Sequence, residues 1–402
     1  MCALCADDVV RPGAPQLDRP TLMALGVKLP AGGDDNYNAR VSVRYRKSGT
    51  DVWRQALPLY RVRPETVRGW NVEPQFSGSI FDLRPATTYE IELRVVDPDG
   101  EIDQTLTLSG TTRAVPGDPA APNQVAVDSA AGLRAAMAAA KPGDVITLAD
   151  GRYDGTYSLR SAGTAENPIV IRGASQDGVI LDGGGCASCN VLEVYGAGFV
   201  HIERLTLQNA NRALRFQTQA AEANVVRWVR IRDTRLGIGA QADEKDFYIA
   251  DNILEGRLTW PSVYTDDNGA RSNDDGIRVQ GFGHVIAHNR ISGYGDAMKV
   301  EQDGSRAVDF YGNEILSAYD NGVELDSSEA NARCLRNRFT NTYATLSVQP
   351  VYGGPAYLIP DLLTYPPREM SGFRWREMER PGERVWAAVR ERLARSAAAE
   401  GR

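Results

Sequence analysis

A short pattern built on asparagine recurs along the second half of the chain and constrains its fold more than any other feature. Asparagine stands at four spaced positions: Asn252, Asn289, Asn313 and Asn337. Two positions after each of them comes an apolar residue: Leu254, Ile291, Ile315 and Phe339. Three positions before each comes another small or apolar residue: Ile249, Ile286, Phe310 and Cys334. Such self-similarity indicates repeated units, each of which packs on its neighbours.

The residues between these positions are rich in glycine and in turn-forming asparagine, which argues against long helices. Short strands that coil with about 23 residues per turn fit the spacing, because their apolar side chains then stack inside. Asparagine side chains stacked in the bends can hydrogen-bond from one coil to the next. The sequence therefore predicts an all-β chain with a right-handed parallel β-helix over residues 125–360.

The part before the repeat has a different pattern. The stretch "ARVSVRYRKSG" alternates apolar and polar residues, with Val41, Val43 and Tyr45 on one side. Tyr89 opens another alternating run directly after a turn, as in a tyrosine corner. These features predict an N-terminal β-sandwich. The expected organisation is a tail (1–16), the sandwich (17–115), a Pro-rich linker (116–124), the β-helix (125–360) and a C-terminal tail with a short amphipathic helix (361–402).

Charge and hydropathy exclude some functions. The 402 residues carry a net charge of -7, which argues against a general nucleic-acid binder. No apolar run reaches the ~18 residues that a membrane-spanning helix needs. The first residues do not form a complete secretory signal. We therefore expect no nucleic-acid partner, no membrane insertion and a monomeric protein.

One strand of each predicted coil carries the charges. Its inward residues are Leu214/Phe216, Ile238/Ala240, Ile277/Val279, Met298/Val300, Val323/Leu325 and Leu346/Val348. Because side chains alternate across a strand, the residues between them point outward in two columns. The first column comprises Arg215, Gly239, Arg278, Lys299, Glu324 and Ser347. The second comprises Gln217, Gln241, Gln280, Glu301, Asp326 and Gln349.

The second column places two carboxylates, Glu301 and Asp326, in neighbouring coils and hence within roughly 5 Å. Like charges that close are unfavourable unless a cation or a raised pKa relieves them. Two further carboxylates, Asp275 and Asp296, stand where strands of this face begin. The column pattern therefore predicts a functional site, although ordinary cross-strand pairing on a solvated face gives the same residues a purely structural explanation.

An insertion lies next to these columns. The step from Gly239 to Arg278 is about 16 residues longer than one coil, and the extra residues fall near 257–273. Trp260, Tyr264 and Arg271 in this segment offer flat rings and a cation for binding a sugar. A long loop in a compact domain is more often functional than accidental.

Two resemblances follow from these motifs. The stretches "PGDVITLADGRYDG" and "ENPIVIRG", followed by asparagine-bearing coils, resemble the pectin-lyase-like β-helix superfamily, with an opening most similar to its alginate lyase and chondroitinase B branch. Residues 17–115 resemble a fibronectin type III module. The first resemblance implies an enzyme that cleaves a uronate-containing polysaccharide and is secreted, periplasmic or displayed at the cell surface.

In β-elimination, a base removes the proton α to a uronate carboxylate while a cation neutralises that carboxylate. Lys299 is the expected base and Arg278 the expected clamp, with Glu324 and Asp296 beside them. Arg215, Trp260, Tyr264, Asp275 and Arg271 are the expected substrate contacts. Glu301 and Asp326 are the expected ligands of a Ca²⁺ ion.

Two alternatives stay open at this point. "NDDGI", "GDAMK" and "DNGVE" also resemble polygalacturonase motifs, with Asp275 and Asp296 matching two acids of that family of hydrolases. Asn321 stands where that family has a histidine. The third possibility is a surface protein that binds glycans in the same groove without cleaving them.

Overall fold

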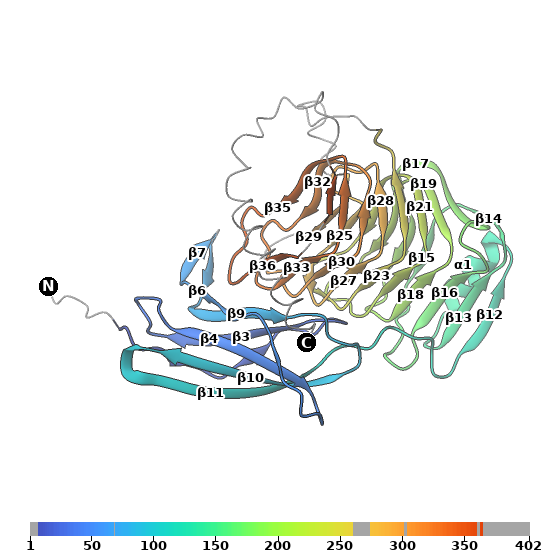
Figure 1. Ribbon diagram of the computed structural model, residues 1–402. Coiled ribbons are helices and arrows are strands. Elements are labelled where there is room, and N and C mark those ends of the chain that lie inside the picture. Colours follow the sequence, from blue (N-terminus) through green and yellow to red (C-terminus); the bar gives the residue numbers. More distant parts are fainter. Residues whose placement is uncertain (1–6, 68, 260–273, 301–303, 360–361, 365–402) are drawn as a thin grey trace, which may run out of the picture. The chain divides into compact units, whose positions relative to one another are not determined.

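The computed structural model describes residues 7–67, 69–259, 274–300, 304–359 and 362–364 (Figure 1). Of the expected C-terminal tail (361–402), only residues 362–364 are described, and they form a strand. The amphipathic helix predicted for this tail lies outside the described residues. No helix in the described part of the chain is long and apolar enough to cross a membrane.

Two antiparallel sheets form the N-terminal part. The first sheet contains β1 (Arg11–Pro12), β2 (Gln16–Leu17), β3 (Leu25–Gly32), β6 (Tyr60–Val62) and β9 (Gln75–Ile80). The second contains β4 (Arg40–Lys47), β5 (Arg54–Gln55), β10 (Thr88–Asp97) and β11 (Ile102–Thr111), with the 3₁₀ turn η1 (Asp99–Glu101) between the last two. A separate hairpin joins β7 (Glu65–Val67) to β8 (Trp70–Val72).

The two sheets share one apolar core, which confirms the predicted sandwich. Val41 and Val43 of β4 are fully buried in the same cluster as Val27 and Leu29 of β3. The alternating pattern of β4 is therefore the pattern of a sheet with one face in the core. The hydroxyl of Tyr89 accepts a hydrogen bond from the backbone N–H of Arg84 at 2.8 Å, as expected for a tyrosine corner.

Parallel strands stacked along three faces form the second part, which confirms the predicted β-helix. The first face is one sheet: β12 (Asn123–Val127), β13 (Asp144–Leu148), β16 (Ile169–Gly173), β18 (Val200–Glu203), β20 (Val225–Arg227), β23 (Tyr248–Ala250), β27 (Val285–Ala287), β30 (Asp309–Tyr311), β33 (Ala332–Leu335) and β36 (Ala356–Ile359). The second face contains β24 (Ile253–Gly256), β28 (Arg290–Ser292), β31 (Glu314–Ile315), β34 (Arg338–Thr340) and β37 (Leu362–Thr364).

The third face carries the candidate site. It contains β25 (Ile277–Val279), β29 (Met298–Val300), β32 (Ala318–Glu324) and β35 (Thr342–Ser347). In the earlier coils the second and third faces are joined by long strands: β17 (Val179–Val194), β19 (Thr206–Phe216) and β21 (Arg230–Gly239). The strands β14 (Gly151–Asp154) and β15 (Tyr157–Leu159) pair with β17, and β22 (Glu244–Lys245) pairs with β26 (Gly281–Phe282).

The predicted asparagine ladder is present inside the bends. The Nδ2 atom of Asn252 donates to Oδ1 of Asn289 at 2.9 Å, Asn289 donates to Asn313 at 3.0 Å, and Asn313 donates to Asn337 at 3.0 Å. All four side chains are buried. The buried amides of Asn252, Asn289 and Asn313 are thus each satisfied by the next coil, which fixes the stacking of neighbouring turns.

Most of the predicted inward positions lie in the core. The pairing register aligns Ile277, Met298 and Val323, and all three are fully buried. Val348 is an exception, because it is exposed and lies just beyond the end of β35. Among the described residues, β35 is the last strand of its face, so no described strand follows it in that sheet.

A single helix stands at the start of the β-helix. It is α1 (Ala130–Ala139), and the Ser129 hydroxyl caps it by accepting from the N–H of Gly132 at 3.2 Å. Leu133 and Met137, one turn apart, are both buried in the core of the β-helix. The helix packs on β12, β13, β14 and β15, so it covers the apolar interior of the first coil.

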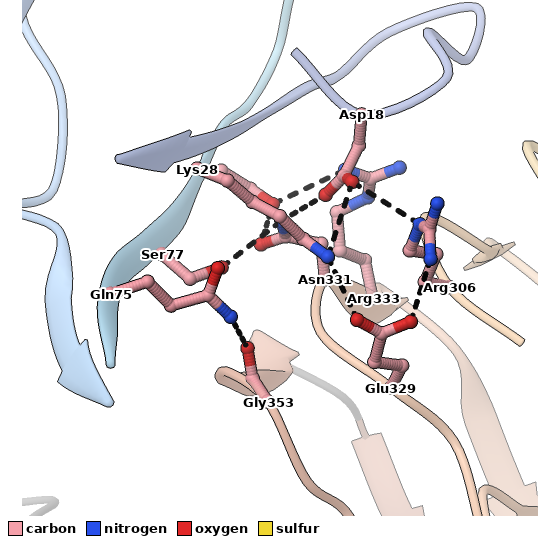
Figure 2. Close-up of polar contacts among 10 residues, drawn as sticks. Asp18, Lys28, Gln75, Ser77, Arg306, Glu329, Asn331, Arg333 and Gly353 are labelled. Atoms are coloured by element: carbon pink, nitrogen blue, oxygen red, sulfur yellow. Dashed lines mark hydrogen bonds and ion pairs between the residues drawn. The ribbon is translucent and has the colours of Figure 1, made fainter. Parts of the chain in front are cut away.

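Charged side chains join the sandwich to the last coils of the β-helix (Figure 2). Lys28 of β3 donates to Glu329 at 2.9 Å, and Arg306 pairs with the same carboxylate at 2.7 Å. The amide of Asn331 donates to Asp18 at 2.6 Å. These groups are largely buried and mutually satisfied, so the contact between the two parts is specific as well as close.

Candidate active site

Strand pairing on the third face aligns the predicted charged residues of the first column across neighbouring strands; this column is called the file below. Arg278 is the register partner of Lys299, and Lys299 is the register partner of Glu324. The file continues to Gly239 on one side and to Ser347 on the other. The first column expected from the sequence is therefore confirmed from Gly239 to Ser347. Arg215 is the partner of Gly239 and extends it by one more strand.

Lys299 is the centre of the cluster. Its Nζ atom lies 3.6 Å from a carboxylate oxygen of Asp275, 3.3 Å from one of Asp296 and 3.6 Å from one of Glu324. The side chain of Lys299 is only 9% exposed. Asp275 and Asp296 reach it from the bends that lead into β25 and β29. Three carboxylates around one buried ammonium strongly favour its charged form.

Two of these carboxyl groups have strongly shifted pKa values. Burial raises the pKa of Asp296 to about 6, against the opposing effect of Lys299. Burial, helped by the charge of Asp296, raises the pKa of Glu324 to about 7. The two carboxyl groups contact the same ammonium and the same amide of Asn321, so the charge of one affects the pKa of the other. The pair can exchange a proton near neutral pH.

Asn321 holds this pair in place. Its Nδ2 atom donates to Oδ1 of Asp296 at 2.9 Å and to Oε2 of Glu324 at 3.2 Å. Its backbone N–H also donates to Oδ1 of Asp296, at 3.2 Å. The sequence singled out this position only as the place where polygalacturonases have a histidine. Its contacts depend on the register shift in β32 between Ala318 and Asn321, which strand alternation does not describe.

The cluster is layered from the surface inward. The side chain of Glu324 is 18% exposed, and that of Arg278 is also partly exposed. Asp296 and Asp275 are buried beneath them. Asp275 also lies 3.6 Å from Arg278, so it links the guanidinium to the ammonium of Lys299. A ligand on this face therefore meets Glu324 and Arg278 first.

An arginine cluster lies beside the carboxylates and comprises Arg212, Arg215, Arg235 and Arg278. Burial, with the positive charges of Arg215, Arg278 and Arg235, lowers the pKa of Arg212 to about 10. Burial and Arg278 also lower the pKa of Arg215. Neither Arg212 nor Arg215 forms an ion pair with a carboxylate in the described part of the chain, whereas Arg235 pairs with Asp274 at 2.6 Å. Cations that destabilise one another in this way favour binding of an anion.

The sequence pattern did not identify Arg212. It lies three positions before Arg215, so strict alternation would place the two on opposite sides of a strand. β19 turns from the second face to the third, and the adjacent residues Ala213 and Leu214 are both buried. This corner breaks the alternation and brings both guanidinium groups to the same region.

The expected calcium ligands are only partly described. Glu301 lies outside the described residues. Oδ1 of Asp326 accepts hydrogen bonds from the Ser347 hydroxyl and from the backbone N–H of Gln349, each at 2.7 Å. Among the described residues, no group of three or more acidic, histidine or cysteine side chains is placed to hold a metal ion. A calcium site at Glu301 and Asp326 stays a prediction, and no chemical step is assigned to it.

The predicted aromatic contacts belong to the insertion. Trp260, Tyr264 and Arg271 lie outside the described residues, so their role as substrate contacts also stays a prediction. The segment rejoins the described chain at Asp274, directly before Asp275 and β25. The insertion is therefore attached at the entrance of the strand that carries Arg278.

Comparisons with known proteins concern the fold. No protein-family model matches the chain, and no curated protein sequence matches it. The chain is similar to the crystal structure of an alginate lyase from Paenibacillus sp. str. FPU-7, with 19% identity and a TM-score of 0.33 over 58% of this chain and 99% of that one. It is similar to the PL6 family alginate lyase AlyGC, with 14% identity and a TM-score of 0.35 over 60% of this chain, and spans 40% of that one.

A third solved structure matches more of the chain but less closely. The pectate lyase Pel3 from Pectobacterium carotovorum has 10% identity and a TM-score of 0.21 over 89% of this chain and 92% of that one. The assignment of a parallel β-helix preceded by a β-sandwich stands on the strand pairing of this chain itself.

Proposed function

We propose that this protein cleaves an acidic, uronate-containing polysaccharide by β-elimination on the third face of its β-helix. The observation that supports this most is Glu324, a partly exposed carboxyl group whose pKa is raised to about 7. It lies 3.6 Å from an ammonium and two strands away from Arg278. A base, a proton donor and a carboxylate-binding cation thus share one file.

The arginine cluster supports an anionic substrate. Arg212 and Arg215 add positive charge beside Arg278, and neither of the two forms an ion pair with a carboxylate among the described residues. A uronate carboxylate at Arg278 would be neutralised there, which makes the proton on the adjacent carbon more acidic. The guanidinium fork suits a carboxylate because it can donate two parallel hydrogen bonds.

Glu324 takes the role of the base in this scheme, and Lys299 that of the acid. The proton α to the substrate carboxylate passes to Glu324, the bond from C4 to the glycosidic oxygen breaks, and a C4=C5 double bond forms. The leaving oxygen takes a proton from the Lys299 ammonium. Glu324 then returns its proton to Lys299 across their 3.6 Å contact. Each group ends in its starting state.

This assignment changes the role that the sequence suggested for Lys299. A lysine acts as a base only in its neutral form, and the three carboxylates around Lys299 stabilise the ammonium instead. We therefore assign proton abstraction to Glu324 and keep Lys299 as donor and counter-charge. Asp296 and Asp275 position these two groups from below.

Hydrolysis is the second candidate, because Asp296 and Glu324 both have raised pKa values, as a general acid requires. Both carboxyl groups, however, contact the same Lys299 ammonium and the same Asn321 amide, whereas the paired carboxyl groups of glycosidases are about 5 Å or more apart with the substrate between them. This geometry favours elimination.

The test is incubation with alginate, polygalacturonate and sulfated glycosaminoglycans, with and without Ca²⁺. Elimination is expected to yield products that absorb in the ultraviolet, with a rate that rises as the pH increases through about 7, because Glu324 must lose its proton. New reducing ends without absorbance would indicate hydrolysis instead. Binding without either signal would leave the protein a glycan-binding module.

A matched pair of variants tests the base. Glu324→Gln keeps the size of the side chain and is expected to lower the rate about 10²–10⁴-fold, the usual contribution of a general base. Glu314→Gln is the control, because Glu314 is partly exposed on the second face and pairs there with Arg290 and Arg338. Equal activity in the two variants would remove Glu324 from the mechanism.

A polysaccharide substrate also bears on location and assembly. Polymers of this kind are met outside the cytoplasm, so we propose that the protein acts as a secreted, periplasmic or cell-surface monomer. Cell fractionation and size-exclusion chromatography with light scattering test the two statements separately.

A further inference from the structure

A cavity lies where the sandwich meets the last coil of the β-helix. Its volume is about 600 Å³. The sandwich lines it with Tyr60, Arg63 and Glu65 from the β6–β7 region, and the β-helix lines it with residues between 346 and 358. This cavity is outside the cluster around Lys299, and the proposed reaction does not use it.

Aromatic rings stand open beside this cavity. Tyr60 is 63% exposed, and Trp70 of the β7–β8 hairpin is 46% exposed. Trp70 stacks on Tyr352, with ring centroids 6.4 Å apart and planes inclined by 26°. The Tyr352 hydroxyl accepts from the backbone N–H of Gly304 at 2.8 Å, which fixes the ring. Val72 packs with Tyr352 and anchors the hairpin. The indole ring of Trp70 is thus held against a fixed neighbour, Tyr352, while it remains exposed.

The cavity lies beside β35, the strand that also carries the end of the file of the candidate active site. Leu346 and Val348, which line it, flank Ser347, and Ser347 is the register partner of Glu324. On the other side, Gly304 lies close to the ring of Trp70 and follows the strand of Lys299 by a few residues. Leu346 and Val348 are inward positions of β35, whereas Ser347 points outward, so a chain lying along Arg278, Lys299 and Glu324 reaches the cavity by passing over the edge of β35, the next strand, ~4.8 Å further on.

The polar groups at the cavity suit a charged sugar. Arg63 lies over the ring of Tyr37, with its guanidinium carbon 4.2 Å from the ring centroid. It forms no ion pair with a carboxylate in the described part of the chain, so it can pair with an anion of the ligand. Glu65 can accept hydrogen bonds from sugar hydroxyl groups. Exposed rings with a few convergent polar groups are the usual make-up of a small-molecule site.

We propose that the sandwich and the β-helix together form a distal saccharide-binding subsite at this cavity. One sugar ring of the polysaccharide stacks on Trp70 or Tyr60, and a uronate carboxylate pairs with Arg63. The sandwich is then part of the substrate-binding surface and is more than a spacer domain attached to the β-helix. The substrate class rests on the proposed function, whereas the subsite itself makes a separate prediction about binding.

Binding is measured in the Glu324→Gln background, where no turnover interferes. Isothermal titration uses alginate and polygalacturonate as disaccharides and as oligomers of about eight units, since strands ~4.8 Å apart put both the file and the cavity within reach of the longer chain. Trp70→Ala is expected to raise the Kd for the long oligomer about fivefold to tenfold, the loss of one aromatic contact, and to leave the disaccharide unchanged. Tyr60→Ala, at a more exposed ring, repeats the test if Trp70→Ala does not fold.

Trp228→Ala is the matched control. Trp228 is 41% exposed and lies beside Arg227 of β20 on the first face, so its removal is expected to change neither Kd. Unchanged binding of the long oligomer by folded Trp70→Ala and Tyr60→Ala overturns the subsite, even if the parent protein cleaves its substrate. Absence of binding by any acidic oligomer overturns it as well. Weakened binding in a protein that cleaves nothing would refute the reaction and keep the subsite.

Discussion

Removal of the buried cation at the centre of the cluster is the sharpest test of the electrostatics. In Lys299→Met the side chain keeps nearly the same length and apolar character, but the ammonium disappears. The carboxylates of Asp275, Asp296 and Glu324 then lose a positive charge 3.3–3.6 Å away. Because Asp275 and Asp296 are buried, water cannot replace that charge.

The expected loss of stability follows from these distances. Opposite charges ~3.5 Å apart attract by about 5 kcal/mol at an effective dielectric constant of ~20. Desolvation of the ammonium offsets most of that attraction in the parent protein. Removal of one partner of a buried pair typically costs about 3–5 kcal/mol, because the remaining charge is left uncompensated. We expect a loss in that range at alkaline pH.

The loss of stability in Lys299→Met is expected to depend on pH. The folded-state pKa values of Asp296 and Glu324 are raised to about 6 and about 7, above their ordinary values of 3.8 and 4.5. Their contribution to stability is therefore complete below the ordinary values and is lost as the pH rises through about 7. Loss of the Lys299 charge raises both pKa values further. The variant should consequently lose little stability at about pH 4 and most at about pH 8.5.

Urea unfolding of the parent and the variant at both pH values measures this difference. Lys47→Met is the control, because Lys47 is exposed on β4 of the sandwich and its loss should change the free energy of unfolding by less than about 0.5 kcal/mol. A Lys299→Met loss that is equal at the two pH values would show that only packing was removed. It would refute the electrostatic account of the site and, with it, the assignment of Lys299 as a group that is charged in the resting protein.

Two further predictions concern stability. Asn313→Leu removes the acceptor of the backbone and side-chain amides of Asn289 and the side-chain donor to the carbonyl of Ile286, and it should cost about 2–3 kcal/mol, seen as a lower urea midpoint. An unchanged midpoint would show that the ladder is dispensable. Arg333→Met leaves the buried carboxylate of Asp309 without the guanidinium that donates to it and should lower the free energy of unfolding by about 3–5 kcal/mol. The double variant Arg333→Met/Asp309→Leu should recover most of this loss. A double variant as unstable as the single one would contradict this reasoning.

The repeat could be recognised in the sequence because side chains alternate between inward and outward positions along each strand. A residue that faces outward on one coil has outward neighbours one coil before and after it, whatever the loops between them do. Arg278, Lys299 and Glu324 could therefore be aligned from spacing alone, and the pairing register agrees. The same reasoning predicted the buried asparagine ladder, since each asparagine occupies the same place in its bend.

The inward–outward alternation fails where strands are irregular. Asn321 follows a register shift in β32, and Arg212 lies at the corner of β19, so neither position follows the alternation of the file. The expected core position Val348 is exposed, and no strand of the third face follows β35 among the described residues. These residues depend on loop geometry and on the end of the stack, which local pattern does not encode.

By itself the sequence determined which residues share the outward file and which way each faces, because a period of two along the strand and a fixed rise between coils leave no other arrangement. Only the tertiary structure decided how deeply Lys299 is buried, that one amide of Asn321 binds both Glu324 and Asp296, and that Trp70 of the sandwich stacks on Tyr352. Burial and dielectric environment are properties of everything packed around a group, and segments far apart in the chain supply most of it.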